Sequence, residues 1–289
     1  MDLTAPFVGS RAIADGVLNR HQLRTRFARV FPDVYLAKST APTLDVRIAA
    51  AWLWSRRTAV VAGLAASHLL GAHWVTAPII ELVHPNTRPP KGIRCRHDEL
   101  PAGEVAFVGR LPVTSGARTA FDIARTEPVD RAVAALDALL RATGVTVTEV
   151  EGLAARHPGV RGLRRAEAVL ALVDPGSESP KETSLRLLLI RNGLPAPQTQ
   201  IEVRDEAGYP IARLDMGWPE LMIAVEYDGD QHRTDRQQYV RDIRRLEMLE
   251  RLGWIVIRVV MEDSSAGVLR RVNAAIDLRR SRLNLRRPA

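Results

Sequence analysis

Two carboxylates and a histidine follow a short apolar run near residue 225. The run begins at Ile223, delivers Glu226 and Asp228 into a turn at Gly229, and reaches His232 three residues later. Burying an unpaired carboxylate is costly, so acids at the end of a buried strand need a reason to be there. Alternate residues of a strand share a face, which predicts that Glu226 and Asp228 lie side by side. Paired carboxylates indicate half of a site for a hard divalent cation.

Two further acids precede this run. Asp215 lies in a predicted strand at residues 211–216, and Trp218-Pro-Glu supplies a turn before Ile223. If the two strands pair antiparallel, Asp215 lies beside Glu226. Glu182 lies in the first turn of a predicted amphipathic helix that Ser179 and Pro180 open. The sequence therefore predicts three acids on three neighbouring elements.

The elements that follow complete this arrangement. Apolar residues recur at three- and four-residue spacing from Tyr239 to Leu252, which predicts a helix with one face in the core. Residues 255–260 form an apolar run without alternation, as expected for a strand covered on both sides. Arg258 interrupts that run and is expected to point toward the acids.

At residues 178–275 the chain resembles the Vsr-related domains of the PD-(D/E)XK nuclease superfamily. The resemblance rests on the order helix-Glu182, strand-Asp215, then Glu-x-Asp-Gly-x-x-His, and it continues through the helix and strand just described. It implies a restriction-endonuclease-like fold in which Asp215 and Glu226 bind metal and Glu182 is the helix acid. Asp228 occupies the position of the lysine in the (D/E)XK motif. His232 is the candidate to perform part of the function of that lysine.

The implied activity is DNA hydrolysis with Mg²⁺ or Mn²⁺. Oxygen ligands hold such a cation, which withdraws charge from the phosphate and lowers the pKa of a bound water. We expect Asp215, Glu226 and Asp228 to hold the metal and His232 to act as base or transition-state partner.

Each residue also has a purely structural interpretation. Ser179-x-x-Glu182 matches a capping box, so Glu182 can serve only to satisfy helix amides. Asp228-Gly229 is a common turn pair. His232 is flanked by polar residues and is compatible with a solvated loop position. Only the joint pattern favours a metal site.

Arginine is the dominant charged residue. The formal net charge is +8, with 41 Lys and Arg residues against 33 acids, and lysine occurs only at 38, 91 and 181. Three arginines, Arg241, Arg244 and Arg245, lie on the helix after the acids and are candidates to contact DNA phosphates. Residues 276–289 are expected to form a basic tail that contacts phosphates or stays solvated.

The composition indicates which kinds of site and which cellular compartment to expect. Cys95 is the only cysteine, which excludes an internal disulfide framework and a cysteine-rich zinc site, and fits a cytoplasmic protein. The first residues lack the pattern of a secretory signal, and the apolar stretch from 58 to 83 contains histidines and Pro78, so no membrane partner is expected. No small-molecule cofactor is indicated.

The N-terminal part is similar, less specifically, to proteins with AbiEi-type antitoxin regions. The similarity rests on Gln22-Leu23, Val34-Tyr-Leu36, Gly63-Leu-Ala-Ala-Ser-His68 and Arg118-Thr-Ala-Phe-Asp122. It implies a winged-helix-like start and a nucleic-acid partner. Residues 10–31 are expected to be helical and residues 34–37 to form a short strand.

The sequence thus predicts an α/β protein with an α+β region at 1–173, a linker at 174–179, a nuclease-like domain with a mixed central sheet flanked by helices at 180–275, and a tail at 276–289. The favoured function is a divalent-metal-dependent DNA endonuclease in repair or mobile-element defence. The alternative is a catalytically inactive, nuclease-like DNA-binding regulator of antitoxin type.

Overall fold

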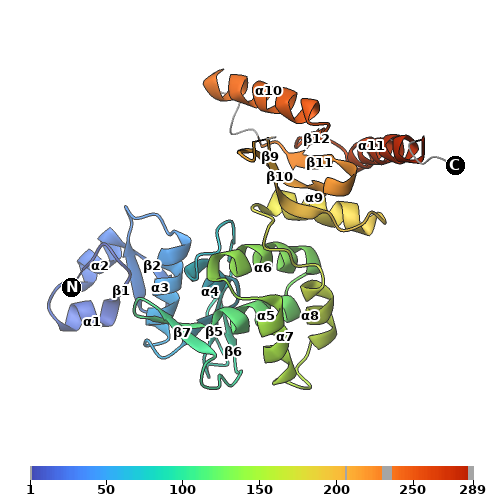
Figure 1. Cartoon of the computed structure of the whole chain (residues 1–289). Coiled ribbons are helices and arrows are strands. Elements are labelled where there is room, and N and C mark those ends of the chain that lie inside the picture. Colours follow the sequence, from blue (N-terminus) through green and yellow to red (C-terminus); the bar gives the residue numbers. More distant parts are fainter. Residues whose placement is uncertain (1, 206, 230–235, 286–289) are drawn as a thin grey trace. The chain divides into compact units, whose positions relative to one another are not determined.

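The chain divides into two units, residues 1–175 and residues 176–289 (Figure 1). The structure is a computed structural model and describes residues 2–205, 207–229 and 236–285. The division falls within the segment 174–179. None of the described helices is both long and apolar enough to cross a membrane.

The first unit opens with a small sheet packed against helices. Its elements are β1 (Phe7–Val8), α1 (Gly9–Ala14), α2 (Arg20–Arg26), β2 (Phe27–Phe31) and β3 (Val34–Ala37), and the sheet order is β1-β3-β2. The next helix, α3 (Leu44–Trp54), contacts all three strands. Buried Phe7 of β1 and Phe27 of β2 meet edge to face with ring centroids 4.9 Å apart, which joins the two outer strands of the sheet.

The strand predicted at residues 34–37 is confirmed as β3, whereas the expectation of helix throughout 10–31 is wrong. Asn19 caps α2 by accepting a hydrogen bond from the Gln22 N–H, and the Gln22 side chain accepts from the Asn19 N–H, so a second helix starts there. The chain leaves the helical conformation at Phe27 because Phe27 and Phe31 are both buried as strand residues. The result is two short helices followed by a β-hairpin.

A second sheet carries the rest of the first unit. Its order is β6-β5-β4-β8-β7, and the strands are β4 (Val60–Ala62), β5 (Ile80–Val83), β6 (Ile93–Arg96), β7 (Val105–Val108) and β8 (Leu111–Thr114). The accompanying helices are α4 (Gly63–Leu69), α5 (Gly116–Thr126), α6 (Val129–Thr143), α7 (Val147–Ala155) and α8 (Leu163–Leu170). Helix α5 contacts each of the other four helices, and its residues 118–124 are all buried.

The second unit is a four-stranded mixed sheet between helices. Its strands are β9 (Gln198–Arg204), β10 (Pro210–Trp218), β11 (Ile223–Tyr227) and β12 (Ile255–Val259), in the order β12-β11-β10-β9. Strands β9, β10 and β11 form an antiparallel meander, whereas β12 pairs with β11 in parallel. The helices are α9 (Pro180–Arg191), α10 (Arg236–Arg251) and α11 (Ser265–Leu285), with a short 3₁₀ turn η1 (Pro219–Leu221).

Each face of this sheet is covered by different helices. Val225 and Ile257 pack with residues of α9 and α11, whereas Ala224 packs with Leu249 of α10 on the other face. Figure 1 shows α9 and α10 on opposite sides of the strands. The predicted α/β class, with a mixed central sheet flanked by helices, is confirmed.

Candidate functional site

Glu226 of β11 is held by an arginine from α10. Arg245 donates from Nη1 to Glu226 Oε1 at 2.8 Å and from Nη2 to Oε2 at 2.9 Å, and the Glu226 side chain is 9% exposed. A two-pronged contact of this kind is the strongest geometry for an arginine–carboxylate pair. The hydrogen bonds to Glu226 also raise the pKa of Arg245. Both oxygens of Glu226 are therefore engaged within the protein.

Asp215 lies next to Glu226, as the hairpin predicted. The β10–β11 ladder pairs Met216 with Val225, and just beyond it Asp215 Oδ2 accepts a hydrogen bond from the Tyr227 N–H at 2.9 Å. Burial raises the pKa of Asp215 to about 7; the Tyr227 N–H opposes the rise, and the charges of Glu182 and Glu226 add to it. The surroundings of Asp215 therefore favour its protonated form more than water does.

Glu182 lies at the start of α9. Its Oε1 accepts from the Ser179 hydroxyl and its Oε2 from the Glu178 N–H, both at 2.8 Å, while the Glu182 N–H donates to Ser179 Oγ at 3.2 Å. The bond from the Glu182 N–H to Ser179 Oγ is the Ser179 half of the predicted capping box, whereas the Glu182 carboxylate accepts from the Glu178 N–H just before the helix. Glu182 therefore ties the segment before α9 to its first turn and also contributes negative charge beside Asp215.

Asp228 has a partner of its own. Arg258 of β12 donates to Asp228 Oδ2 at 2.5 Å, as the position of Arg258 in the sequence indicated, and the Asp228 N–H donates to the Val259 carbonyl at 2.8 Å. The predicted pairing of Asp228 with Glu226 on one face is replaced by two separate arginine–carboxylate pairs. His232 lies outside the described residues.

The acids meet the chemical requirement for a hard cation but not the geometric one. Among the described residues no three His, Cys, Asp or Glu side chains gather as a metal site. Arg245 occupies both oxygens of Glu226, and the Ser179 hydroxyl and the Glu178 N–H occupy the two oxygens of Glu182. In this arrangement the carboxylates do not fit Mg²⁺ or Mn²⁺.

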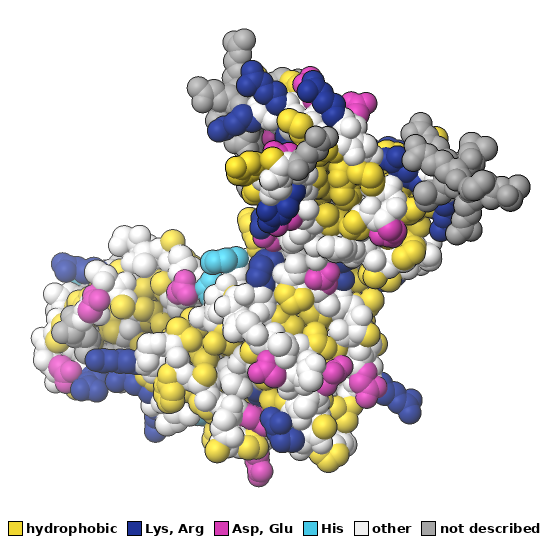
Figure 2. Space-filling model, in the orientation of Figure 1, with side chains coloured by type: hydrophobic (Ala, Val, Ile, Leu, Met, Phe, Trp, Pro, Cys, Tyr) yellow, Lys and Arg dark blue, Asp and Glu magenta, His cyan; other side chains and the backbone are white. Residues whose placement is uncertain are grey.

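The three arginines expected to contact DNA on α10 differ from one another. Arg241 and Arg244 are exposed, and Figure 2 shows Lys and Arg side chains along α10. Arg245 is committed to Glu226. Only the first two are free to reach an outside phosphate.

The first unit presents a second group of arginines. Four exposed side chains, hereafter the α2 surface, belong to α2 and the strand after it: Arg20, Arg24, Arg26 and Arg29. Within the described part of the chain none of them pairs with an acid. Leu23 on the inner side of α2 is buried and fixes the helix to the small sheet. Lys38 binds the end of α2 by donating from Nζ to the Thr25 carbonyl at 2.8 Å. These residues were not identified from the sequence, although three arginines within seven residues of a helix without acids are a usable pattern.

The first unit also contains a buried ionic network that the sequence did not reveal. Arg118 donates to Glu104 at 2.5 Å and to Asp122 at 3.0 Å, and Arg96 donates to Asp122 at 2.7 Å. His157 contacts the other oxygen of Glu104 at 2.7 Å. Asp122 is fully buried. The network links α5 to β6, to the residue that precedes β7 and to the segment that follows α7.

Comparison with known proteins shows the family to which the chain belongs. Two curated proteins of Mycobacterium tuberculosis, Uncharacterized protein MT2308 of strain CDC 1551 / Oshkosh and Uncharacterized protein Rv2248 of strain ATCC 25618 / H37Rv, are each 32% identical to the chain over 237 residues. The match covers 81% of this chain and 86% of each relative. The chain belongs to the family of these mycobacterial proteins. Because 237 residues exceed the 175 of the first unit, members of this family share parts of both units.

One region of the chain matches a described domain. Residues 49–172 match the model of the AbiEi antitoxin C-terminal domain, which supports the antitoxin-like resemblance. The match runs from within α3 to just past α8 and contains the whole Arg118–Asp122 network. The α2 surface precedes it, and the acids of the second unit follow it.

Proposed function

We propose that this protein is a DNA-binding regulator of antitoxin type that contacts DNA through the α2 surface. The observation that carries the proposal is the pair of helices α1 and α2, followed by a β-hairpin, with exposed arginines that have no acidic partner in the described structure. The AbiEi match over residues 49–172 supports the same type of function.

The arrangement of residues 7–37 suits a DNA groove. In helix-turn-helix proteins the second helix of the pair enters the major groove, and winged-helix proteins have a β-hairpin after that helix. Here α2 takes the second position, the β2–β3 hairpin follows, and α3 covers the sheet from behind. Arg20 and Arg24 are one helical turn apart and exposed, so both can reach the same groove.

Salt dependence of DNA binding tests the proposal. Each phosphate neutralised by an arginine contributes about 0.9 to the slope of log K against log salt concentration. We expect labelled duplexes, enriched from a random-sequence pool, to bind the wild type, with the slope reduced by about 2 in Arg20→Ala/Arg24→Ala. Arg110→Ala, an exposed arginine at the β7–β8 turn, is the matched control and keeps the slope. Equal slopes in all three proteins would remove the proposal.

A second candidate is a DNA endonuclease of the Vsr-like type. Its support is the order of Glu182, Asp215 and Glu226 on α9, β10 and β11, together with an Asp215 whose pKa is near 7. The engagement of Glu226 by Arg245 speaks against it, because a divalent ion has to replace that arginine before it can bind. The inactive regulator explains these contacts without such a rearrangement.

Cleavage assays separate the two candidates. Purified wild type and Asp215→Asn are incubated with supercoiled, mismatched and single-stranded DNA in Mg²⁺, Mn²⁺ or EDTA. The regulator predicts binding without cleavage by either protein. Cleavage that needs metal and is lost in Asp215→Asn would instead establish the nuclease.

A further inference from the structure

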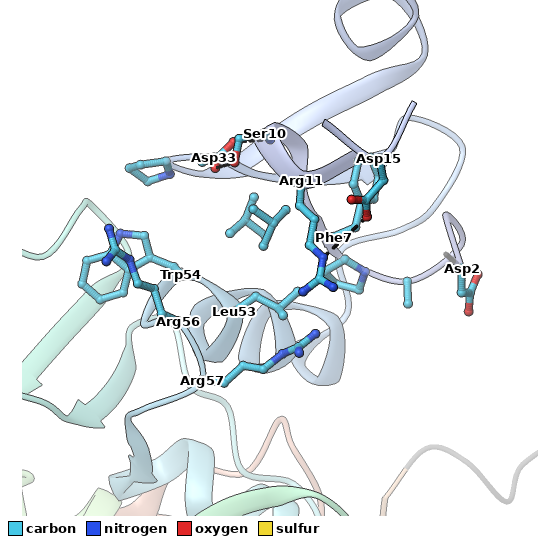
Figure 3. A pocket seen from close by; sticks show the side chains of 15 residues that line it. Asp2, Phe7, Ser10, Arg11, Asp15, Asp33, Leu53, Trp54, Arg56 and Arg57 are labelled. Atoms are coloured by element: carbon cyan, nitrogen blue, oxygen red, sulfur yellow. Dashed lines mark hydrogen bonds and ion pairs between the residues drawn. The ribbon is translucent and has the colours of Figure 1, made fainter. Parts of the chain in front are cut away.

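A pocket of about 990 Å³ lies in the first unit, and none of its lining residues belongs to α2 (Figure 3). Three segments line it: residues 2–15, the β2–β3 turn at 32–34, and residues 53–57 at the end of α3. The first two segments belong to the small sheet and its helices, and the third belongs to the region that matches the AbiEi domain. A ligand in this pocket would contact both parts.

Two arginines of the pocket have an unusual backbone. Arg56 and Arg57 are consecutive and both left-handed, with φ of 57° and 64°. Their N–H groups close the end of α3 by donating to the carbonyls of Leu53 and Trp52, at 2.9 and 3.0 Å. Glycine is the residue that normally occupies such positions, because a side chain there is strained. Strain of this kind occurs often at sites with a function.

The guanidinium groups of these arginines have few partners. The Arg57 guanidinium lies 5.8 Å from the ring centre of Trp52, and neither arginine pairs with an acid in the part of the chain that the structure describes. In Figure 3, Arg11 extends from α1 toward Leu53, Arg57 extends from the end of α3, and Arg56 lies beside Trp54. Arg11 has only an exposed contact of 3.5 Å with Asp15.

The acids of the pocket are satisfied by their own neighbours. Asp33 accepts from the N–H and the hydroxyl of Ser10 at 2.8 and 2.5 Å. Asp2 accepts from the N–H and hydroxyl of Thr4 at 2.8 and 2.6 Å, which lowers the pKa of Asp2. The pocket therefore presents the guanidinium groups of Arg11, Arg56 and Arg57 to a ligand, while its three carboxylates (Asp2, Asp15 and Asp33) are held by neighbouring donors, and the apolar side chains of Phe7, Val34 and Leu53 complete the lining.

We propose that this pocket binds a phosphate ester through the guanidinium groups that line it, those of Arg56 and Arg57 among them, and that the apolar wall receives the rest of the ligand. Planar guanidinium groups match phosphate oxygens, and the volume is that of a small-molecule site. The phosphate belongs either to a free nucleotide or to a DNA strand. Binding of a free nucleotide is independent of the proposed function, whereas binding of a DNA strand rests on it.

A glycine double variant tests the proposal without endangering the fold. Arg56→Gly/Arg57→Gly removes both cations and relieves the left-handed backbone, so the variant is expected to fold at least as well as the wild type. Binding of AMP and of inorganic phosphate is measured by titration calorimetry, and binding of a labelled duplex by anisotropy. Arg110→Gln is the control for a lost surface charge.

If the ligand is a free nucleotide, AMP binds the wild type and the control, and its affinity falls at least tenfold in the glycine variant. If the phosphate belongs to DNA, AMP does not bind, and duplex affinity falls at least tenfold in the glycine variant relative to the control. The duplex result in Arg20→Ala/Arg24→Ala shows separately whether the α2 surface binds. The proposal is overturned if neither AMP nor duplex binding distinguishes the glycine variant from the control.

Discussion

On α2 the guanidinium groups of Arg20 and Arg24 reach solvent with no acidic partner in the described structure, whereas in the second unit Arg245 has both Nη atoms on the carboxylate of Glu226. The first arrangement leaves charge available to an outside ligand. The second uses the charge to neutralise an acid that would otherwise be buried alone. Counting arginines in this chain therefore says little about DNA binding until their partners are known.

The largest effect in this comparison is expected at Arg118, which is more deeply buried than Arg245. Arg118→Met leaves Glu104 and Asp122 without one of their cations in the interior. Breaking a buried pair from one side costs about 3–5 kcal/mol of unfolding free energy. Urea unfolding followed by circular dichroism measures this loss. Arg94→Met is the matched control, since its contact with Glu81 is half exposed and worth less than about 1 kcal/mol; a similar loss in both variants would refute the ranking.

A smaller but clear effect is expected at Arg245. Arg245→Met leaves Glu226 buried without a cation, and we expect a loss of about 2–3 kcal/mol, reduced from the fully buried case because the Arg245 side chain is 28% exposed. Arg244→Met, one residue away and exposed, should change stability by less than about 0.5 kcal/mol. Thermal unfolding of the two variants measures this difference in stability. Equal melting temperatures would show that the Arg245–Glu226 pair does not hold α10 to β11.

Asp215 should make stability depend on pH. Its pKa is raised to about 7 in the folded state, while the unfolded carboxyl ionises near its ordinary value of 3.8. The folded state therefore holds the proton more tightly, and this carboxyl costs stability progressively as pH rises from about 4 to about 7. The rise of this pKa from 3.8 to about 7 corresponds to about 4 kcal/mol, and solvent screening of the partly exposed side chain reduces this value. Asp215→Asn removes that cost and can still accept the Tyr227 N–H, so it should gain about 1–2 kcal/mol over the wild type at pH 8 compared with pH 4.

The measurement is the difference in unfolding free energy between wild type and Asp215→Asn across this pH range. Asp205→Asn, in the exposed turn between β9 and β10, supplies the control. A difference that does not change with pH would mean that Asp215 ionises normally.

The smallest effect on stability is expected on the α2 surface. Arg20→Ala/Arg24→Ala should alter the free energy of unfolding by less than about 0.5 kcal/mol, because neither side chain has an acidic partner to lose. Differential scanning fluorimetry is sufficient to measure this. A large destabilisation would show that these arginines support the fold, and the proposed DNA contact would lose its basis.

Local patterns predicted more of the second unit than of the first. The start of α9 at Ser179, the contact of Asp215 with β11 and the approach of Arg258 to Asp228 all follow from capping, alternation and strand order over short distances. The break between α1 and α2 and the strand β2 were missed because such short elements, of five to seven residues, show no clear period. The pairing of Arg245 with Glu226 depends on how α10 packs across the sheet.

The buried network of the first unit could not be predicted from the sequence, because its contacts also depend on tertiary packing. Arg96, Glu104, Asp122 and His157 come from separate segments spread along residues 96–157. A sequence shows each of them as an ordinary charged residue. Only the tertiary fold shows that they compensate one another, so the charged residues with the largest expected effect on stability were the hardest to find.

The parallel pairing of β11 with β12 has a consequence for synthesis on the ribosome. The β9–β11 meander can form as soon as it emerges, but β12 joins only after α10 has been made, because a parallel partner needs a long crossover. Until then β11 is an open edge, and the face that α11 and α9 share is covered by α9 alone. A nascent chain that stalls before residue 259 exposes this edge to other chains. The last thirty or so residues thus protect the second unit from aggregation as well as completing its core.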